Sequence, residues 1–265
     1  MKRASIDTNI DCLSVEGGTA YLHTSPEYAL KRLLSSGVGD CYFLGHVYRK
    51  EELGRYHNPE FTMVEWYRIG FSFSEIIQET AEFLFLFFGK LPISTISYRE
   101  AFEKFVGIDP KTSSLETLQS LTREKWSEKE CIHYLLSHKI EPNLGHNELT
   151  VLIDYPPDEA ALAKTEIVQG ERVAKRFEIY YQGIELANGY DELADAEELK
   201  KRFEKTNAQR ERSGKEKYLL DEKFLTSLKV LPECSGVALG FDRALMLHMK
   251  KKSIKEVIPF DWETL

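Results

Sequence analysis

Residues 49–67 read RKEELGRYHNPEFTMVEWY, and this stretch decides the fold class of the chain. Residues 41–49 just before its loop are rich in aromatic and β-branched side chains, and residues 61–68 have strand composition again. Residues 50–59 lie between them and carry charged residues, glycine and proline, which are typical of a turn or loop. The pattern predicts two strands joined by a charged loop.

A second segment, residues 236–243, reads GVALGFDR and predicts a glycine-containing strand that leads directly into a helix. Together the two segments supply Arg49, Arg55 and Arg243. A guanidinium group binds two phosphate oxygens at once, and glycine lets a flat base approach the backbone. The combination predicts an ATP site. The alternative for Arg243, a surface arginine at a helix N-terminus, is electrostatically unfavourable because that end of a helix repels cations.

Length and composition favour one domain over residues 1–265, and the family resemblance given below implies that it is a catalytic domain. The chain has 265 residues, of which 42% are apolar, and this is enough to bury one sizeable core. Its net charge of −8 argues against an extended tRNA surface, because binding many phosphates requires clustered Lys and Arg.

The cysteines and the apolar runs predict a cytoplasmic protein that does not enter a membrane. Cys12, Cys41, Cys131 and Cys234 are scattered without metal-ligand spacing, so reduced thiols are expected rather than a zinc site or disulfides. The N-terminus lacks the apolar core of a signal peptide. The most apolar run, FLFLFF at residues 83–88, is too short to span a bilayer and suits a buried helix over residues 74–89.

Periodicity along the chain predicts an α+β fold, with an antiparallel sheet flanked by helices. Ser25 and Pro26 are expected to start a helix that ends at Gly37. A helical insertion is expected over residues 97–138, where Ser97 with Glu100, and Ser127 with Glu130, each fit a capping box. Further expected elements are a strand at 149–154, a hairpin of 177–181 with 184–188, a polar helix at 195–212 and a strand at 235–239.

Four blocks of the sequence resemble one family in the same order. RKEELGRYHNPEFTMVEWY and GVALGFDR resemble motifs 2 and 3 of the class II aminoacyl-tRNA synthetases, in the lysyl-tRNA synthetase branch. The block LHTSPEYALKRLL at 22–34 and the block RFEIYYQGIELANGYDEL at 176–193 are similar to the short paralogues that ligate (R)-β-lysine to elongation factor P. The resemblance runs from about Tyr21 to the C-terminus.

This resemblance implies the class II synthetase catalytic fold, ATP and Mg²⁺ as cofactors, and elongation factor P and (R)-β-lysine as partners. It makes Arg49 and Arg243 the catalytic residues, with Arg49 on the α-phosphate and substrate carboxylate. Phe61 and Arg243 would enclose the adenine. The remaining ATP contacts that it implies are Lys50, Glu51, Asn58, Glu185, Leu186 and Gly240, and the implied Mg²⁺ ligands are Glu185 and Glu192. Taken alone, two glutamates at a strand end are more often solvated.

The amino-acid pocket implied by the family consists of Ser25, Pro26, Glu27, Glu65, Tyr67, Glu192 and Ala238. Strand alternation independently places Phe61, Met63, Glu65 and Tyr67 on one face. A buried carboxylate is costly unless a cation meets it, and a substrate with two amino groups supplies one. The alternative is a core glutamate satisfied by a local Arg or Lys.

Ala238 is the most specific indication of the substrate. The similar lysyl-tRNA synthetases have Gly at this position, whereas the β-lysine ligases have Ala. One methyl group in a tight pocket changes the discrimination between two similar substrates by roughly 1–3 kcal/mol.

The chain departs from the family at its start. No segment before the TSPE block resembles motif 1, the helix and strand that form the family's dimer interface. Either the start of the sequence is misplaced, or the chain is a shortened form with a weakened interface. The resemblance implies a homodimer, and the missing motif 1 argues against a strong one. Lys50 stands where relatives have Asn, and Arg55 lies one position earlier than the γ-phosphate arginine of the tRNA synthetases. The leading hypothesis is an ATP-dependent ligase acting on elongation factor P. The alternatives are an amino-acid ligase with a tRNA or small-molecule acceptor, and an inactive ATP- or protein-binding module.

Overall fold

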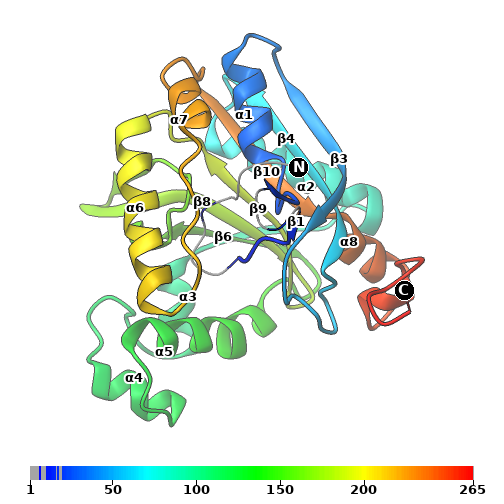
Figure 1. Ribbon diagram of the computed structural model, residues 1–265. Helices are drawn as coiled ribbons and strands as arrows, with labels where there is room; N and C mark the ends of the chain where they lie inside the picture. Colours follow the sequence, from blue (N-terminus) through cyan, green and yellow to red (C-terminus); the bar gives the residue numbers. More distant parts are fainter. Residues whose placement is uncertain (1–5, 7–9, 16, 18–19, 265) are drawn as a thin grey trace. The chain divides into compact units, whose positions relative to one another are not determined.

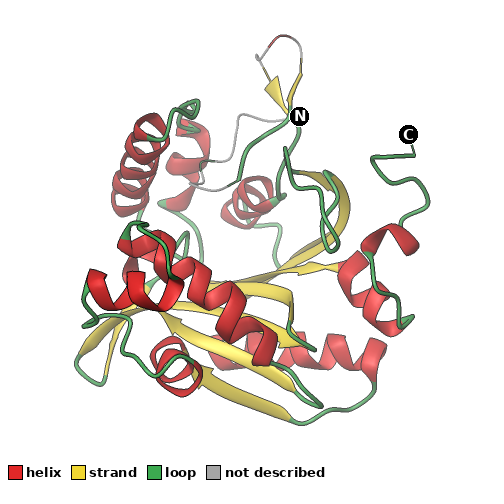
Figure 2. Cartoon of the chain, turned by 90° about the horizontal axis from the view of Figure 1, so that it is seen from below, coloured by secondary structure: helices red, strands yellow, loops and turns green. Residues whose placement is uncertain are grey.

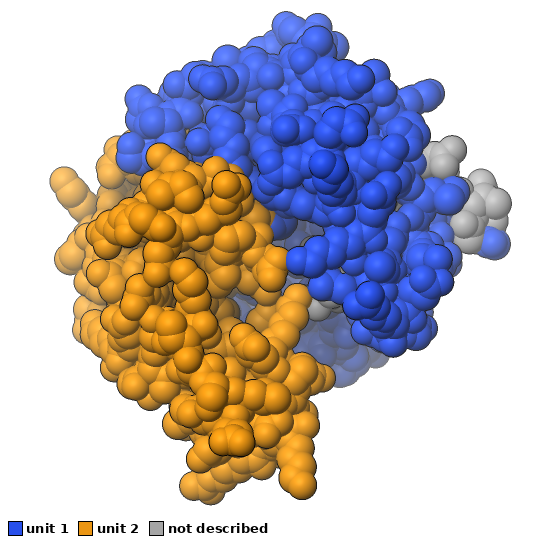
Figure 3. Space-filling model, turned by 90° about the vertical axis from the view of Figure 1, so that its left-hand side faces the viewer, with its two compact units in different colours: residues 1–76, 161–164, 190–265 blue, residues 77–160, 165–189 orange. Residues whose placement is uncertain are grey.

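The computed structural model describes residues 6, 10–15, 17 and 20–264 (Figure 1). The chain forms two compact units, which Figure 3 colours separately. The first contains Met1–Ile76, Ala161–Lys164 and Tyr190–Leu265, and the second contains Ile77–Ala160 and Thr165–Gly189. One catalytic domain over residues 1–265 stays a prediction.

The first unit contains three paired antiparallel strands, β3 (Cys41–Tyr48), β4 (Glu60–Ile69) and β10 (Cys234–Gly240), with β4 in the middle. The two strands predicted around the charged loop are therefore confirmed, as is the strand of the GVALGFDR segment. In this register Glu65 lies opposite Ala238, and Tyr67 lies opposite Gly236.

Helices α1 (Glu27–Ser35), α6 (Ala196–Arg212) and α7 (Glu222–Leu228) share one core in this unit. The unit also contains α8 (Phe241–His248), a 3-10 turn at Ile254–Glu256 and a two-stranded sheet of β1 (Ser14–Val15) and β2 (Ala20–Tyr21). The ring of Tyr28 on α1 stacks on Phe224 of α7 with centroids 4.1 Å apart. Leu199 and Phe203 are buried on α6.

Helix α1 begins one residue later than the sequence predicted. Pro26, not Ser25, is the cap residue, and Glu27 is the first helical residue. The Ser25 hydroxyl still accepts the backbone N–H of Glu27 at 3.0 Å, so it satisfies one of the free amides at the helix start. Gly37 follows the helix with a φ of +85°, a conformation that glycine adopts without strain.

Asp11 ties the segment before β1 to two distant parts of the first unit. Its carboxylate contacts Arg210 at 2.7 Å and Lys215 at 2.9 Å, and its carbonyl accepts the backbone N–H of Lys50 at 2.8 Å. The N–H of the next residue, Cys12, donates to the Tyr218 hydroxyl at 3.0 Å. These bonds hold the charged loop after β3 at its first residue.

The second unit contains β5 (Ile93–Ser97), β6 (Leu149–Tyr155), β7 (Thr165–Val168), β8 (Glu171–Tyr181) and most of β9 (Ile184–Asp191). The pairs β6–β8 and β7–β8 are antiparallel, whereas β5 pairs with β6 in parallel. The predicted β8–β9 hairpin is confirmed. Its two turn residues, Gln182 and Gly183, have φ of +50° and +74°, as a type I′ turn requires.

Helix α2 (Phe73–Phe88) confirms the predicted apolar helix, with Ile76, Ala81 and Leu84 fully buried. Within the described ranges, no helix combines the length and apolar character that crossing a membrane requires. Figure 2 shows how helices and strands alternate with loops along the chain.

The predicted helical stretch after Ser97 contains α3 (Tyr98–Phe105), α4 (Leu115–Thr122) and α5 (Glu128–Leu135), followed by a π-helical turn at Leu136–Ile140. Short 3-10 turns follow at Glu141–Asn143 and Pro157–Glu159. Both predicted capping boxes, Ser97 with Glu100 and Ser127 with Glu130, are present.

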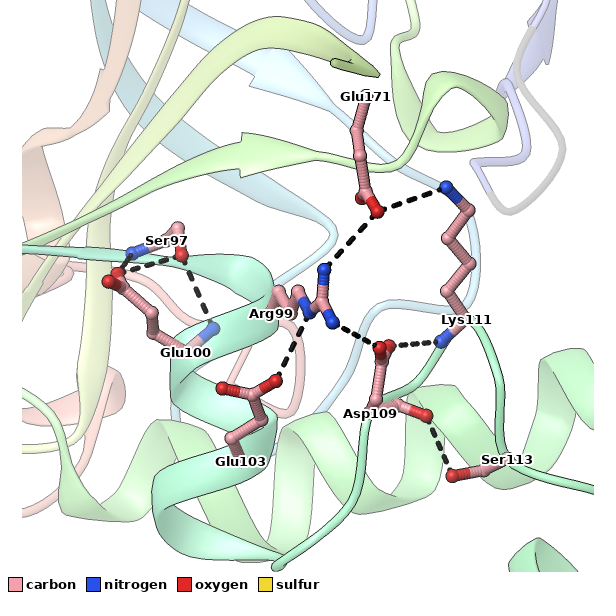
Figure 4. A network of polar contacts seen from close by, with 8 residues as sticks. All are labelled: Ser97, Arg99, Glu100, Glu103, Asp109, Lys111, Ser113 and Glu171. Atoms are coloured by element: carbon pink, nitrogen blue, oxygen red, sulfur yellow. Dashed lines mark hydrogen bonds and ion pairs between the residues drawn. The ribbon is translucent and has the colours of Figure 1, made fainter. Parts of the chain in front are cut away.

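An exposed ion-pair network joins α3 to the residues that follow it and to β8 (Figure 4). The guanidinium of Arg99 contacts Glu103 at 3.1 Å, Asp109 at 2.7 Å and Glu171 at 3.2 Å. Lys111 also contacts Glu171 at 3.3 Å. Because exposed ion pairs contribute little individually, the network orders this surface more than it stabilises the unit.

Candidate active site

Three carboxylates and one ammonium group meet inside the first unit. Glu27 and Lys31 come from α1, Glu65 comes from β4, and Glu192 follows β9. Glu65, Lys31 and Glu192 are all at most 2% exposed. When all four groups are ionised, three negative charges face one positive charge, so two negative charges are in excess.

Glu65 is held by two hydroxyl groups. The Ser25 hydroxyl donates to its Oε2 at 2.7 Å, and the Tyr67 hydroxyl donates to its Oε1 at 2.8 Å. Ser25 therefore connects the start of α1 to β4, and Pro26 fixes the backbone between Ser25 and the helix. The predicted pocket residues Ser25, Glu27, Glu65 and Tyr67 are thus brought together.

Lys31 lies between two of the carboxylates. Its Nζ is 2.6 Å from Oε1 of Glu27 and 2.5 Å from Oε2 of Glu192. It also lies 5.9 Å from the centre of the Tyr67 ring. Burial alone would lower the pKa of Lys31, but Glu192 and Glu27 outweigh it and raise this pKa above its usual value. Lys31 is therefore charged at neutral pH.

Glu192 carries an unsatisfied oxygen. Burial raises the pKa of Glu192 above its usual range, the ammonium of Lys31 opposes this shift, and Glu27 adds to it. Oε1 of Glu192 is buried and has no hydrogen-bond donor among the described residues. A buried carboxylate oxygen without a donor is costly, so this atom is suited to bind a cation from a ligand.

Strand β10 leaves little space beside this pocket. A Cβ on Gly236 would lie 2.3 Å from Cε1 of Tyr67 and 2.6 Å from Oε1 of Glu192, so only glycine fits. Two residues further along β10, Ala238 lies opposite Glu65 and is partly exposed. The predicted pocket residues Ala238 and Glu192 therefore belong to the same cluster as Glu65 and Tyr67.

A positively charged cluster forms the other part of the site. The Arg49 guanidinium lies 5.1 Å from the centre of the Phe61 ring, and its closest carboxylate contact, with Glu52, is 3.7 Å long. Arg243 donates to the Tyr56 carbonyl at 3.2 Å and to Nε2 of His57 at 2.5 Å.

His57 shows how much positive charge this cluster holds. Burial, followed by the charges of Arg243 and Arg49, lowers the pKa of His57 to about 4. The ring is therefore neutral at pH 7, and Nε2 accepts from Arg243 because a guanidinium only donates. Two arginines close to one neutral histidine form a site suited to an anion such as phosphate.

The remaining predicted ATP contacts are spread over the charged loop and two strands. Lys50 and Glu51 are exposed and contact each other at 3.3 Å. Asn58 is buried, donates to the Glu60 carbonyl at 2.7 Å and accepts the Trp262 N–H at 3.1 Å. Gly240 caps α8, while Glu185 and Leu186 lie on β9 in the second unit.

The described residues contain no group of three or more His, Cys, Asp or Glu side chains arranged to hold a metal ion. The four cysteines are free thiols.

Sequence reasoning missed Lys31 and His57. Lys31 lies three residues after Tyr28 and three before Leu34, so it occupies the apolar face of α1, and this spacing was an available signal. A lysine is nevertheless usually expected at the surface. For His57, only its place between Arg55 and Asn58 in the charged loop pointed to the site.

Paired antiparallel strands joined by an arginine-bearing loop, with a third strand that runs into an arginine-bearing helix, are the catalytic architecture of the class II aminoacyl-tRNA synthetases. The chain belongs to this family, since the family model described as tRNA synthetases class II (D, K and N) matches residues 10–263.

Three related proteins carry the name elongation factor P–(R)-β-lysine ligase. The protein from Avibacterium paragallinarum is 43% identical over 92% of this chain and 78% of its own length. Those from Pseudoalteromonas translucida and Proteus mirabilis are 41% and 40% identical, over 91% and 92% of this chain and 77% and 78% of their own lengths. The family and these names identify the chain as an enzyme of the ligase class.

Proposed function

We propose that the protein activates (R)-β-lysine with ATP and transfers it to a lysine side chain of elongation factor P. The observation that carries this proposal is the cluster of Lys31 with Glu27 and Glu192, next to the buried Glu65, in which Oε1 of Glu192 lacks a donor among the described residues. The names of the related proteins agree with it.

The charge of the pocket selects the class of substrate. With all four groups ionised, the two excess negative charges match two ammonium groups, as in a diamino acid, and binding of an ammonium at Glu192 favours its ionised form. A neutral side chain in the substrate would leave at least one buried carboxylate without a counter-ion. Glu65 and Glu192 would bind the two amines, and the partly exposed Ala238 would limit where the amine nearest to the carboxyl group lies.

The arginine cluster fits the phosphates of ATP. An oxygen of the substrate carboxylate attacks the α-phosphorus, the bond from this phosphorus to the β-phosphate oxygen breaks, and pyrophosphate leaves. Arg49 would neutralise the charge on the α-phosphate and hold the attacking carboxylate, while Arg243 and Phe61 would hold the adenine. Catalysis of this step depends on alignment and charge neutralisation more than on proton transfer.

The neutral ring of His57 supports this role of Arg243. Because Nε2 of His57 accepts from Arg243, it orients the guanidinium without cancelling its charge. The other proposed contacts of ATP are Lys50, Glu51, Asn58, Glu185, Leu186 and Gly240.

Mg²⁺ would be held by Glu185 and Glu192, since carboxylate oxygens are the ligands that this ion prefers. The unsatisfied Oε1 of Glu192 fits a cation, although the same atom also suits the substrate amine. When bound, the ion would neutralise phosphate oxygens and orient them.

In the second step the amine of the acceptor lysine attacks the carbonyl carbon of the adenylate, AMP leaves, and the new amide nitrogen loses a proton. A translation factor as acceptor implies a cytoplasmic enzyme. The homodimer of the family is also part of the proposal, without an extended tRNA surface.

The test is the mass of elongation factor P after incubation with the protein, ATP, Mg²⁺ and either (R)-β-lysine or α-lysine. We expect elongation factor P to gain one lysyl residue, with (R)-β-lysine preferred. Glu65→Gln should abolish the gain, whereas Glu166→Gln, a substitution of an exposed strand glutamate, should not. Pyrophosphate exchange without any gain in mass would favour an amino-acid ligase with another acceptor. Absence of both would contradict the proposal.

A further inference from the structure

Lys31 is a completely buried charge that neither step of the proposed reaction requires. It lies on the face of α1 that carries Tyr28 and Leu34, where an apolar residue would be expected. Its side chain ends between Glu27 and Glu192 at 2.6 and 2.5 Å, so two of its three N–H donors have carboxylate acceptors.

The cost of burying this ammonium indicates a role beyond filling space. A buried ion pair is often no more stabilising than well-packed apolar residues of the same size. An apolar residue at position 31 would, however, leave Glu27 and Glu192 beside Glu65 without a positive charge between them. A buried cation at position 31 is therefore explained if substrate binding requires the carboxylates of Glu27, Glu65 and Glu192.

Glu192 depends on Lys31 for its orientation. Its backbone is held by an N–H···O bond to the Cys234 carbonyl at 3.1 Å and by a bridge to Ala163. Its side chain contacts Lys31 through Oε2, while Oε1 has no donor in the described chain. Fixing one oxygen of a planar carboxylate also fixes the direction of the other.

We propose that Lys31 is a positioning residue for the amino-acid substrate: it binds Oε2 of Glu192 and thereby holds Oε1 where the substrate amine binds. This inference rests on the proposed function, because it concerns the same pocket. Lys31 does not itself touch the substrate, and it acts through Glu192. With Lys31 present, the three ionised carboxylates leave two uncompensated negative charges, whereas without it they would leave three.

The experiment is a double-mutant cycle in ATP–pyrophosphate exchange, with the KM for (R)-β-lysine and the KM for ATP measured separately. At saturating Mg²⁺, Lys31→Met should raise the KM for (R)-β-lysine by about tenfold or more and leave the KM for ATP within about twofold. In the Glu192→Gln background, Lys31→Met should add less than about twofold, since the residue through which it acts is already altered.

The double variant keeps the test decisive even if Lys31→Met alone does not fold. Lys31→Met with Glu192→Gln removes one charge of each sign, so the excess of two negative charges is retained. Arg32→Met is the matched control, because it removes a positive charge from the next, exposed position of α1 and should change neither KM.

If Lys31→Met raised the KM for (R)-β-lysine tenfold in the Glu192→Gln background as well, Lys31 would not act through Glu192 and the proposal would be overturned. Equal rises in both KM values would also overturn it, since they would indicate a general structural role. A wild-type protein that shows no exchange with any diamino acid would instead contradict the proposed function.

Discussion

Replacing Gly236 with alanine should damage the amino-acid site and leave the arginine cluster of the ATP site intact. Gly236 lies on β10 directly opposite Tyr67. A Cβ at this position would lie 2.3 Å from Cε1 of Tyr67, 2.5 Å from Cδ1 and 2.6 Å from Oε1 of Glu192. Carbon atoms normally pack about 3.5–4.0 Å apart, so the ring must move by about 1 Å or more.

The surroundings of Tyr67 determine the size of the effect. The residue is 2% exposed and lies on β4, which is paired on both sides by β3 and β10, so the ring has little room to move. Overpacking of this kind typically costs 1–3 kcal/mol. For a chain of this size, we expect the unfolding midpoint to fall by about 2–12 °C.

The assay combines thermal unfolding with the KM values for (R)-β-lysine and ATP in pyrophosphate exchange. Displacement of Tyr67 and Glu192 should raise the KM for (R)-β-lysine by about tenfold or more, with the KM for ATP little changed. Gly240→Ala is the matched control for stability on the same strand, since its Cβ would lie 3.6 Å from Cδ of Arg243, an ordinary contact. A Gly236→Ala variant with the wild-type midpoint and an unchanged KM for (R)-β-lysine would refute the reasoning.

Four further predictions concern the same site. Arg49→Ala and Arg243→Ala should each abolish pyrophosphate exchange in a folded protein, because loss of a charged transition-state contact costs several kcal/mol; near-normal exchange would remove the ATP assignment. Glu185→Gln and Glu192→Gln should each weaken the dependence of exchange on Mg²⁺, and unchanged magnesium titrations would make these glutamates ordinary residues. Ala238→Gly should raise activation of α-lysine relative to (R)-β-lysine by about tenfold, and an unchanged ratio in a folded variant would show that Ala238 does not set the choice. Burial raises the pKa of Glu192 to about 8, so the carboxyl is protonated below this pH and binds an ammonium group only when it is ionised. The KM for (R)-β-lysine should therefore fall as the pH rises through about 8. The same pH dependence of this KM in Glu192→Gln would contradict the assignment.

Most of the helices and strands that were predicted correctly follow from regular local patterns in the sequence. The strands β3 and β4, the apolar helix α2 and the two capping boxes all follow from composition or from contacts within a few residues. The four-residue strand β7 and the seven-residue helix α7 were missed because each is too short to show a clear period. The parallel pairing of β5 with β6 was also missed, since it joins residues far apart in the sequence.

Site residues could be predicted where the residue type itself restricts the chemistry. They could not be predicted where the role depends on a contact with a residue far away in the sequence. Glu65 was expected to need a partner because it lies on the same strand face as apolar and aromatic residues. Its partners in the structure are the hydroxyls of Ser25 and Tyr67. The pairing of Lys31 with Glu192 depends on the tertiary fold, which no local pattern reports.

The contacts of Asp11 have a consequence for the order in which the chain becomes structured during synthesis. Arg210, to which the Asp11 carboxylate binds, lies 199 residues later. At 5–20 residues per second, a ribosome needs about 10–40 s to make that stretch. During this time β4 can pair with β3, but its other edge waits for β10, which lies later still. An unpaired strand edge is open to other chains. The speed of translation therefore sets how long the hydrophobic edge at Met63–Tyr67 must be shielded, and all residues of the second unit are synthesised before that edge is covered.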